Sequence, residues 1–595
     1  MRIWHSVIAA LLLLMVCANA QQSANRSSYP ATEEAPVSAA LPIAAPLRGQ
    51  PEPQPPIAAP SASAPSTTVD QVVDRAIERE HALMEMLKTR TPLVETYLQD
   101  LKFEPRVGPA PVQDHYFLGR MDLSESLDRR DYLSKDTSFE KRLLGGFNRL
   151  YSLEYKPMGF SWMIYADRND FNRQTYDFKF EHREFLGDVR CMVFEVSAKK
   201  GTGNGRFHGR IWVEDQDYNI VRLNGTYEPR PRNAYFFHMD SWRLNLVQGY
   251  WVPAYIYSEE GDFGYRSKDQ IAFKAQTRLW GYDLHKDGRN RELTKVLVDS
   301  TVKDESRTEQ DASPLQAEWQ WQQQAGDNVI ERLQSAGLLA PEGEVDKVLE
   351  TVVKNLLISN NIELPGQVRT RVMLTSPLET FSVGSNIVIS RGLLDVLPDE
   401  ACLAMVLSHE LAHIILGHNL GRKFAFYDRL LFSDESTYQN LGFRHVPEEE
   451  TAADQKALDL LKNSPYAQKL DTPGLFLREL AARGRALSAL LTPHLGDGFT
   501  DRKGSVDRMV ALMNSAPALD PNKLGQIAAL PLGGRVKLNA WDDHAELTKN
   551  TPVPVTSARG KMPLEVTPFF PRLTRYGAVV NAKGPVNTAN PIPNN

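Results

Sequence analysis

The segment from Ala401 to Leu416, ACLAMVLSHELAHIIL, is an almost unbroken apolar run that nevertheless contains two histidines and a glutamate. It contains no proline or glycine, and Asp399 precedes it as a suitable N-cap, so the pattern predicts a long helix over residues 400–424 that buries this run. Burying ionisable side chains is costly unless they are bound. We therefore expect the folded protein to provide an ion or hydrogen-bonding groups that offset the cost of burying His409, Glu410 and His413.

The spacing of these three residues is suited to a metal ion. Residues four apart lie on one face of a helix, so His409 and His413 can bind one ion through their imidazoles. Glu410 points about 100° away from His409 and is placed to take a proton from a metal-bound water. We therefore expect about one Zn²⁺ per chain, with Glu410 as the catalytic base. The alternative is two satisfied core histidines beside a surface glutamate.

A catalytic zinc ion needs a third protein ligand, and the same helix does not supply one in the usual way. The HExxHxxGxxH pattern would require glycine at 416 and histidine at 419, where this chain has Leu416 and Asn419. His418 lies on roughly the opposite face of the helix, so we expect it to pack or to support a ligand. A ligand from a later helix is the remaining possibility.

That later helix follows Pro447 and carries acidic residues one turn apart. Glu450 can bind zinc while Asp454, four residues later, can accept a hydrogen bond from the other nitrogen of a histidine. Glu448 and Glu449 compete for the ligand position, but neither has a carboxylate four residues ahead. They are also expected at the N-terminus of a helix because of its dipole.

The first part of the chain has a different sequence pattern, with one helical segment followed by many strand-like runs. Residues 69–102 have a helical pattern, VVDRAIEREHALMEML followed by PLVETYLQDL. From about residue 114 to 299, strand-like runs such as MVFEVSAK, FHGRIWVEDQDYNIVRLNGTYE and SWRLNLVQGYWVPAYIYSE follow one another between turn residues. Many short sequential strands predict an antiparallel sheet or an open barrel.

The N-terminus is typical of an exported protein. A short basic start, an apolar run from Val7 to Val16 and a small-residue site ending at Ala20 form a signal-peptide pattern. Cys17 raises the alternative of a lipoprotein, but Met15 and Val16 are poor residues before a lipidated cysteine. We expect an exported chain, periplasmic or secreted, whose mature part has no transmembrane anchor.

The net charge and the cysteine content argue against a nucleic-acid-binding protein and against a disulfide-stabilised fold. The net charge of −6 and the lack of a basic stripe argue against a nucleic-acid partner. Cys191 and Cys402 remain after the leader, and we expect two buried thiols because they lie far apart in the sequence. Hydrophobic cores must then provide the stability.

These patterns predict an α+β multidomain protein, with an antiparallel β-sheet or half-barrel domain before a mainly helical catalytic domain that contains a small sheet. The expected divisions are a signal peptide (1–20), a Pro/Ala-rich disordered linker (21–68), a β-rich domain (69–303), a connector (304–327), a domain that carries the metal motif (328–515) and a C-terminal extension with a disordered tail (516–595).

The stretch from Asn328 to about Ser515 resembles the M48 family of zinc metallopeptidases. The matching features are ETFSVGSNIVISRGLLDVL, SHELAHIILGH and EETAAD. The resemblance implies a gluzincin-type fold with His409, His413 and Glu450 as zinc ligands and Glu410 as the base. It also implies that SVGSNIVIS is an edge strand that pairs with an extended substrate. The substrate-binding residues would be Ser382, Val383, Gly384, Ser385 and Asn386.

One departure from that family concerns the residue that supports the reaction. Many soluble members carry a Thr-His-Pro stretch before a helical arginine, whereas this chain has TDRKGSVDRM, with Asp501 in the place of the histidine. Arg508 still fits the later arginine. The group that stabilises the oxyanion is left open among Arg502, His494 and Tyr438.

The β-rich region carries a second resemblance. The hairpin GRIWVEDQDYNIVRL is similar to hairpins in the half-barrels of lipoprotein-sorting (LolA-like) domains. That resemblance implies a lipid or lipoprotein partner, held by a concave surface lined with residues of RIWV and GYWVPAYIY. The alternative is that these aromatic residues fill the sheet's own core.

Together these features predict an exported zinc-dependent metalloendopeptidase that cleaves polypeptides, with envelope proteins in quality control as the candidate substrates. The alternative of another class is a non-catalytic, zinc-stabilised chaperone or a lipoprotein- or lipid-binding protein. An exopeptidase is a third possibility, but no acidic anchor for a substrate amino group is visible.

Overall fold

The structure is a computed structural model, and it describes residues 68–104, 108–124, 129–131, 159–203, 205–228, 237–260, 272–284, 314–418, 438–439, 441–492, 495–501, 503–506, 508–517, 536–538, 545–547, 566, 568 and 570–577. The predicted signal peptide and all but the last residue of the predicted linker lie outside these residues.

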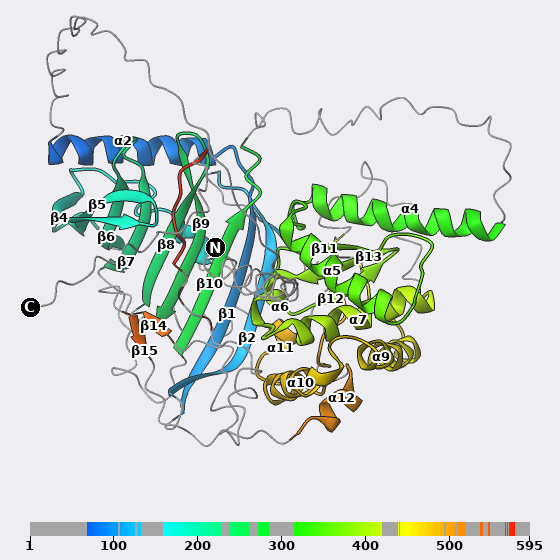
Figure 1. Ribbon diagram of the computed structural model, residues 1–595. Coiled ribbons are helices and arrows are strands. Elements are labelled where there is room, and N and C mark those ends of the chain that lie inside the picture. Colours follow the sequence, from blue (N-terminus) through cyan, green and yellow to red (C-terminus); the bar gives the residue numbers. More distant parts are fainter. Residues whose placement is uncertain are drawn as a thin grey trace, which may run out of the picture.

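A large antiparallel sheet forms the first half of the described chain (Figure 1). Its strand order is β3-β2-β1-β10-β9-β8-β7-β6-β5-β4, so neighbours in sequence are mostly neighbours in space. The strands are β1 (Leu93–Glu104), β2 (Gly108–Met121), β3 (Arg129–Asp131), β4 (Tyr176–Leu186), β5 (Val189–Ala198), β6 (Arg206–Glu214), β7 (Ile220–Glu228), β8 (Phe237–Val247), β9 (Tyr250–Glu260) and β10 (Ala272–Trp280).

The helix expected over residues 69–102 is wrong in its second half. Helix α2 (Val69–Leu87) is capped by Thr68, which accepts a hydrogen bond from the Gln71 amide, and PLVETYLQDL then forms β1. Both faces of β1 are buried, because Val94 and Leu98 face one layer and Leu93 and Tyr97 the other. A strand buried on both faces lacks polar alternation, and its apolar pattern is easily confused with that of a helix.

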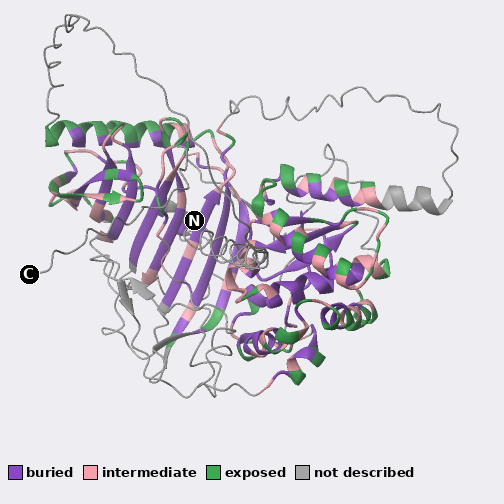
Figure 2. Cartoon of the chain, viewed as in Figure 1, coloured by how far each residue is buried: buried purple, intermediate pink, exposed green. Residues whose placement is uncertain are grey.

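Both faces of the central strands are covered, whereas the edge strand β4 is mostly exposed or partly exposed (Figure 2). On one face lie α2 and the 3₁₀ helix η1 (Gly159–Ile164). On the other, Trp212, Trp242 and Trp251 belong to the same hydrophobic cluster as the helical domain. All three are at most 2% exposed. Apart from Tyr250, which is 46% exposed, the aromatic residues of RIWV and GYWVPAYIY are therefore used in packing within the described structure.

The second half of the described chain is a mainly helical domain with a three-stranded sheet of order β11-β13-β12 (Figure 1). Its elements are α4 (Pro314–Ser335), α5 (Glu344–Ser359), β11 (Arg369–Met373), β12 (Thr380–Val383), β13 (Asn386–Ser390), α6 (Arg391–Val396), α7 (Glu400–Leu416), α9 (Pro447–Lys462), η3 (Ala467–Lys469), α10 (Asp471–Arg483), α11 (Ser488–Leu491) and α12 (Val510–Ser515). The predicted fold class, a large antiparallel sheet beside a helical domain with a small sheet, is confirmed.

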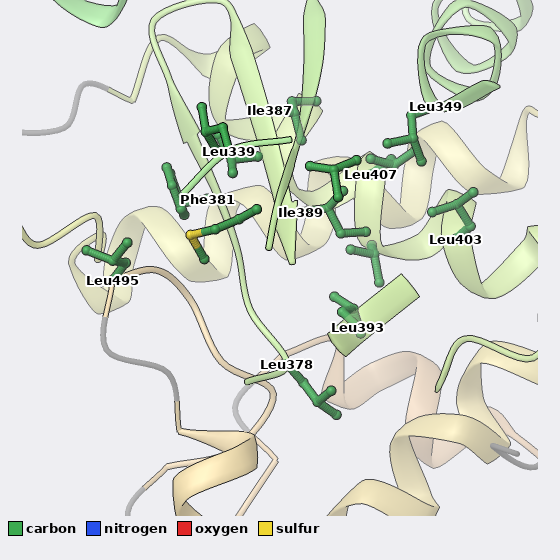
Figure 3. Packing of buried hydrophobic residues seen from close by; sticks show 14 of the residues in the cluster. Leu339, Leu349, Leu378, Phe381, Ile387, Ile389, Leu393, Leu403, Leu407 and Leu495 are labelled. Carbon is green, nitrogen blue, oxygen red and sulfur yellow. The ribbon is translucent and has the colours of Figure 1, made fainter. Parts of the chain in front are cut away.

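The helical domain is held together by apolar residues from its helices and its small sheet (Figure 3). Leu349 of α5 and Leu407 of α7 gather around Ile389 of β13, and all three are at most 1% exposed. Burial of each such side chain stabilises the fold by about 1.5–3 kcal/mol. This core fixes α7 against the small sheet and thereby positions the polar residues that α7 carries.

The C-terminal part returns to the large sheet. β14 (Val536–Leu538) and β15 (Ala545–Leu547) form a separate hairpin. Residues 566 and 570–577 then lie against the sheet, where the Leu573 carbonyl accepts from the Asp188 amide and Arg575 pairs with Glu214 at 2.8 Å. Phe570 contacts Trp242 edge-on at 5.7 Å between ring centroids.

The predicted connector, the two cysteines and the expected lack of a transmembrane anchor can each be compared with the structure. Helix α4 begins at Pro314, so the second half of the predicted connector is helical. Cys191 and Cys402 are buried and free. Within the described residues, no helix is both long and apolar enough to span a bilayer.

Candidate metal centre

Helix α7 begins where its sequence predicts, but it ends at Leu416, before the predicted end at residue 424. Asp399 is the N-cap, and its Oδ1 accepts from the Cys402 amide at 2.9 Å. The helix ends at Leu416 because Gly417 adopts a left-handed conformation (φ 69°), which glycine tolerates without strain. His409, Glu410 and His413 are completely buried on this helix.

Helices α7 and α9 bring two imidazoles and a carboxylate together. The Nε2 atoms of His409 and His413 lie 3.1 Å apart, and Glu450 Oε2 lies 3.1 Å and 3.8 Å from them. Ligands about 2.05 Å from a tetrahedral zinc ion are separated by about 3.3 Å, so the three atoms are spaced like ligands of one ion. The structure thus brings together the three predicted ligands.

The missing hydrogen bonds of the buried carboxylates also indicate a site for a cation. Among the described residues, Glu410 Oε2, Glu450 Oε1 and Asp497 Oδ2 are buried without a hydrogen-bond partner. Buried polar atoms are normally satisfied, and a cation among these atoms would satisfy them. The residues present therefore fit the zinc ion that the sequence implies.

The other predicted acidic residues have different surroundings. Asp454 Oδ1 lies 2.9 Å from His409 Nδ1, and its Oδ2 accepts from the Met509 amide at 2.7 Å. This is the supporting geometry that was predicted for Asp454. Glu449 instead bonds His445 at 2.9 Å, and Glu448 is exposed, so neither joins the metal group.

His418 supports His413 although it lies beyond the helix. The turn at Gly417 brings His418 Nδ1 to 3.0 Å from His413 Nδ1. If His413 Nε2 binds a metal, its Nδ1 carries the proton and donates to His418. Burial and the neighbouring His413 lower the pKa of His418, which keeps its ring neutral and able to accept.

The electrostatics around His409 are dominated by carboxylates. Burial and Arg508 lower the pKa of His409, but hydrogen bonds to Asp454 and Glu450 and the charge of Glu410 outweigh them and raise the pKa to about 9. For the same reason His409 holds the pKa of Glu450 far below its ordinary value, against the effect of burial. Positive charge is therefore favoured at this position.

Glu410 is held by two residues from outside its helix. Thr380 Oγ1, on β12, donates to Glu410 Oε1. Arg508 donates to Thr380 Oγ1 at 2.8 Å and lies 3.5 Å from the same Glu410 oxygen. One carboxylate oxygen is thereby fixed, while Oε2 has no partner among the described residues. Arg508, which the sequence matches to the family's later arginine, contacts the base through Thr380.

Asp497 is a member of the site that the sequence did not reveal. One ligand atom each from His409, His413, Glu450 and Asp497 lie within 4.8 Å of one another. Burial raises the pKa of Asp497, and Arg508, 3.7 Å away, opposes the rise. Asp501, which occupies the family's histidine position, instead accepts from the amides of Lys503 and Ser505 in its own turn.

Asp497 reaches the site because its segment lies along β12. The Asp497 amide donates to the Thr380 carbonyl at 2.8 Å, and the Thr380 amide donates back at 3.4 Å. A Cβ on Gly496 would come within 2.4 Å of the Thr380 carbonyl, so only glycine permits this approach. No helical spacing connects Asp497 to α7, and only the folded chain brings the two together.

The predicted substrate strand needs a correction. The stretch SVGSNIVIS is not one edge strand, because β13 lies between β11 and β12 and only Ser382 and Val383 belong to the edge strand β12. Gly384 and Ser385 form the hairpin turn. Ser385 bonds Gln323, and Asn386 bonds Asp327 at 3.1 Å, so these two side chains contact α4.

The three candidates for oxyanion stabilisation have different outcomes. Tyr438 is 3% exposed and belongs to the shared hydrophobic cluster. His494 and the side chain of Arg502 lie outside the described residues. The choice among them stays open.

A cleft of about 680 Å³ opens beside the metal group. It is lined by Arg444 and His445, by Glu450 of α9, and by Asp497, Thr500 and Lys503 from a later part of the chain. This volume is within the range of small-molecule pockets and could take a few residues of a peptide.

Comparison with known families and structures adds one match and several weak likenesses. The model of peptidase family M48 matches residues 343–433, which include His409, Glu410 and His413. The sequence-based assignment to this family is thereby confirmed for that segment. Comparison with curated proteins gives no match.

Three solved structures have a weak likeness to the chain. A LolA superfamily protein of Nitrosomonas europaea is 11% identical, covering 36% of this chain and 95% of its own, with a TM-score of 0.18. A lipoprotein-sorting protein domain of Vibrio parahaemolyticus is 10% identical over 37% and 96%, with a TM-score of 0.20. A DUF1329 family protein of Desulfovibrio piger is 10% identical over 38% and 98%, with a TM-score of 0.19. At such TM-scores we draw nothing further from them.

Proposed function

We propose that this chain, which carries a domain of peptidase family M48, is a zinc-dependent endopeptidase. The observation that carries the proposal is the convergence of His409 Nε2, His413 Nε2 and Glu450 Oε2 within 3.8 Å of one another, with Glu410 adjacent on α7. The family match supports a metallopeptidase in general. The identity of the metal and the endopeptidase activity are our inference.

The roles of the protein residues follow from their geometry. A bound zinc ion would polarise a peptide carbonyl and lower the pKa of a bound water. His409, His413 and Glu450 would hold the ion, and Asp454 orients His409. Glu410 would take the proton of the attacking water and later give it to the leaving amine. Thr380 holds Oε1 of Glu410 by a hydrogen bond. Oε2, which has no partner among the described residues, would accept the proton of the water.

The substrate would lie between the cleft and the outer edge of β12. Along a strand, backbone groups point alternately to the two sides, so Ser382 shares the outward direction of Thr380. Thr380 already pairs with Asp497 on that side, which leaves Ser382 as the first position for an extended substrate. Movement of the segment 495–497 would extend the pairing to Thr380.

The biological setting is also a proposal. The leader-like N-terminal sequence supports export, and unfolded or damaged envelope proteins would suit an edge strand that recognises backbone more than side chains. The rival function is a zinc-stabilised binding protein without activity, which would have the same metal group. A lipid or lipoprotein partner of the large sheet would belong to that second function.

The decisive experiment is metal analysis together with casein cleavage, with and without a chelator. We expect about one zinc ion per purified chain and cleavage that the chelator abolishes. His413→Ala should lose both zinc and activity, whereas His182→Ala, on the exposed side of the sheet, should lose neither. A chain without stoichiometric zinc after reconstitution would refute the site. Zinc without cleavage of any polypeptide would favour the binding protein.

A further inference from the structure

Two carboxylates of the large sheet reach into the helical domain beside the metal group. The first is Glu95 on β1, which is 1% exposed. Its Oε1 accepts from the Ser376 amide at 2.6 Å, and its Oε2 accepts from the Ser376 hydroxyl at 2.9 Å. Arg278 of β10 donates to Glu95 at 2.8 Å and also to the Leu374 carbonyl. The sheet thus binds the segment 374–376 through both backbone and side chain.

The second carboxylate is Asp114 on β2, which is 5% exposed. Its Oδ1 accepts from the Ala489 amide at 2.8 Å and its Oδ2 from the Leu490 amide at 2.9 Å. These amides open the short helix α11, whose N-cap residue Leu487 offers no side-chain cap. Free amides at the start of a helix need an acceptor, and here the acceptor comes from the large sheet.

The two bound segments lead directly into the metal site. Ser376 is four residues before Thr380, the residue that holds Glu410. The segment after α11 leads to Asp497, which pairs with Thr380. The two segments also bond each other, because the Leu378 amide donates to the Leu490 carbonyl at 2.7 Å.

A third buried carboxylate continues the connection. Glu379 Oε2 accepts from the Leu495 amide at 3.3 Å, and Glu379 is 2% exposed. Figure 3 shows Leu378, Phe381 and Leu495 in the packing of this region. Hydrogen bonds and short stretches of the chain together therefore connect Glu95 and Asp114 in the sheet to the edge strand and its neighbour 495–497.

We propose that Glu95 and Asp114 are positioning residues of the peptidase site, so that the large sheet is part of the catalytic unit. This inference rests on the proposed function for its activity readout. The sheet fixes the ends of the two segments that carry Thr380 and Asp497. Loss of either carboxylate frees those segments, and Glu410 then loses its fixed orientation. A ligand or partner that distorts β1 and β2 would change cleavage by the same route.

The test compares Glu95→Gln and Asp114→Asn with Glu80→Gln in the full-length protein. Glu80 is a matched control because it is 1% exposed and pairs with Arg243 at 2.6 Å, but it lies on α2, on the opposite face of the sheet. Ser376→Ala is a milder variant that keeps the Glu95–Arg278 pair intact. Hydrogen–deuterium exchange of residues 374–380 and 488–497 is measured with kcat, KM and zinc content.

We expect Glu95→Gln and Asp114→Asn to raise exchange in both segments about tenfold, since hydrogen bonds to charged groups are lost. They should lower kcat about tenfold with KM and zinc content nearly unchanged. Ser376→Ala should act in the same direction but less strongly. Glu80→Gln should lower the thermal midpoint without changing exchange in the two segments.

The inference is overturned if exchange in the two segments is unchanged in both variants, or if Glu80→Gln raises it as much. It is also overturned if exchange rises while kcat stays at the wild-type value. If the wild-type chain cleaves nothing, the proposed function fails. The exchange measurement then still decides whether the sheet holds the two segments.

Discussion

The buried charges of the large sheet and those around α7 are arranged in opposite ways. In the described sheet, the buried arginines Arg222, Arg243 and Arg278 are each paired with a carboxylate. Arg222 bonds both oxygens of Asp240 at 2.8 and 3.1 Å, and its guanidinium lies 4.3 and 4.4 Å from the rings of Trp212 and Trp242. A closed pair of this kind needs no ligand.

Around α7 the charges do not balance. Glu410, Glu450 and Asp497 lie near one another, and Arg508 is the described arginine that approaches two of them. One buried oxygen of each of these three carboxylates has no hydrogen-bond partner among the described residues. This difference distinguishes two kinds of buried charge. The paired charges of the sheet contribute to stability, whereas the unbalanced carboxylates around α7 are arranged to bind a cation. The predictions below test that division.

Glu410→Gln should have the largest effect on function. An amide cannot take the proton of water, so kcat should fall about 10³-fold, which corresponds to about 4 kcal/mol on the barrier. Zinc content and the thermal midpoint should stay close to the wild-type values, because the ligands and the packing are unchanged. Single-turnover cleavage with metal analysis provides the measurement. Residual activity above a few per cent would mean that Glu410 is not the base.

Arg222→Met should have the opposite profile. It leaves Asp240 buried without its main partner, and breaking a buried pair costs about 3–5 kcal/mol of unfolding free energy. Zinc binding should stay stoichiometric, since Arg222 lies in the sheet. Arg190→Met, at a pair where Arg190 is 58% exposed, is the control and should cost well under about 1 kcal/mol. Loss of zinc in Arg222→Met would contradict a purely structural role.

Glu379 gives a pH test within the helical domain. Burial raises its pKa to about 7, although the amides of Leu495 and Gly496 and the Thr375 hydroxyl oppose the rise. Because the folded-state pKa lies above the ordinary value of 4.5, the protonated form favours folding. This stability is present below about pH 4.5 and is lost as the pH rises through about 7.

The measurement is chemical unfolding of Glu379→Gln and of the wild type across this range. The wild type should lose about 1–2 kcal/mol more than the variant between pH 5 and pH 8. Glu363→Gln, at an exposed position, should follow the wild type. Parallel pH profiles of the wild type and Glu379→Gln would show that the Glu379 carboxyl does not titrate with folding.

Asp497→Asn should have a smaller effect on the metal. Asp497 is close enough to bind zinc or to bond a zinc-bound water, but three other ligands remain. We expect stoichiometric zinc with an affinity about tenfold lower, measured by competition with a chelating dye. Asp501→Asn is the control, since Asp501 bonds only its own turn. Complete loss of zinc would make Asp497 a ligand as essential as Glu450, and unchanged affinity would remove it from the site.

The part of this site that could be predicted is the part that local geometry decides. His409, Glu410 and His413 share one helix, and Glu450 and Asp454 share another, so their relative positions follow from 3.6 residues per turn. The approach of the two helices was predicted through the M48 resemblance.

What could not be predicted depends on tertiary packing. Thr380 and Asp497 meet α7 only after β12 and the segment 495–497 pair, and nothing in their sequence spacing encodes that. The strand β1 was mistaken for helix because packing on both faces removed its polar alternation.

The smallest effect is expected for a lipid probe on the large sheet. Trp212, Trp242 and Trp251 are at most 2% exposed, so a fluorescent fatty acid would have to displace packed side chains to reach them. We expect no saturable binding by the full-length wild type at a Kd below about 10 μM. Trp251→Ala would leave an apolar cavity, and a weak gain of binding is expected there. Saturable binding by the wild type, with a change in tryptophan fluorescence, would show that the sheet opens. The sheet would then have a ligand site of its own. Its buried groups could no longer be regarded as purely structural, in contrast to those around α7.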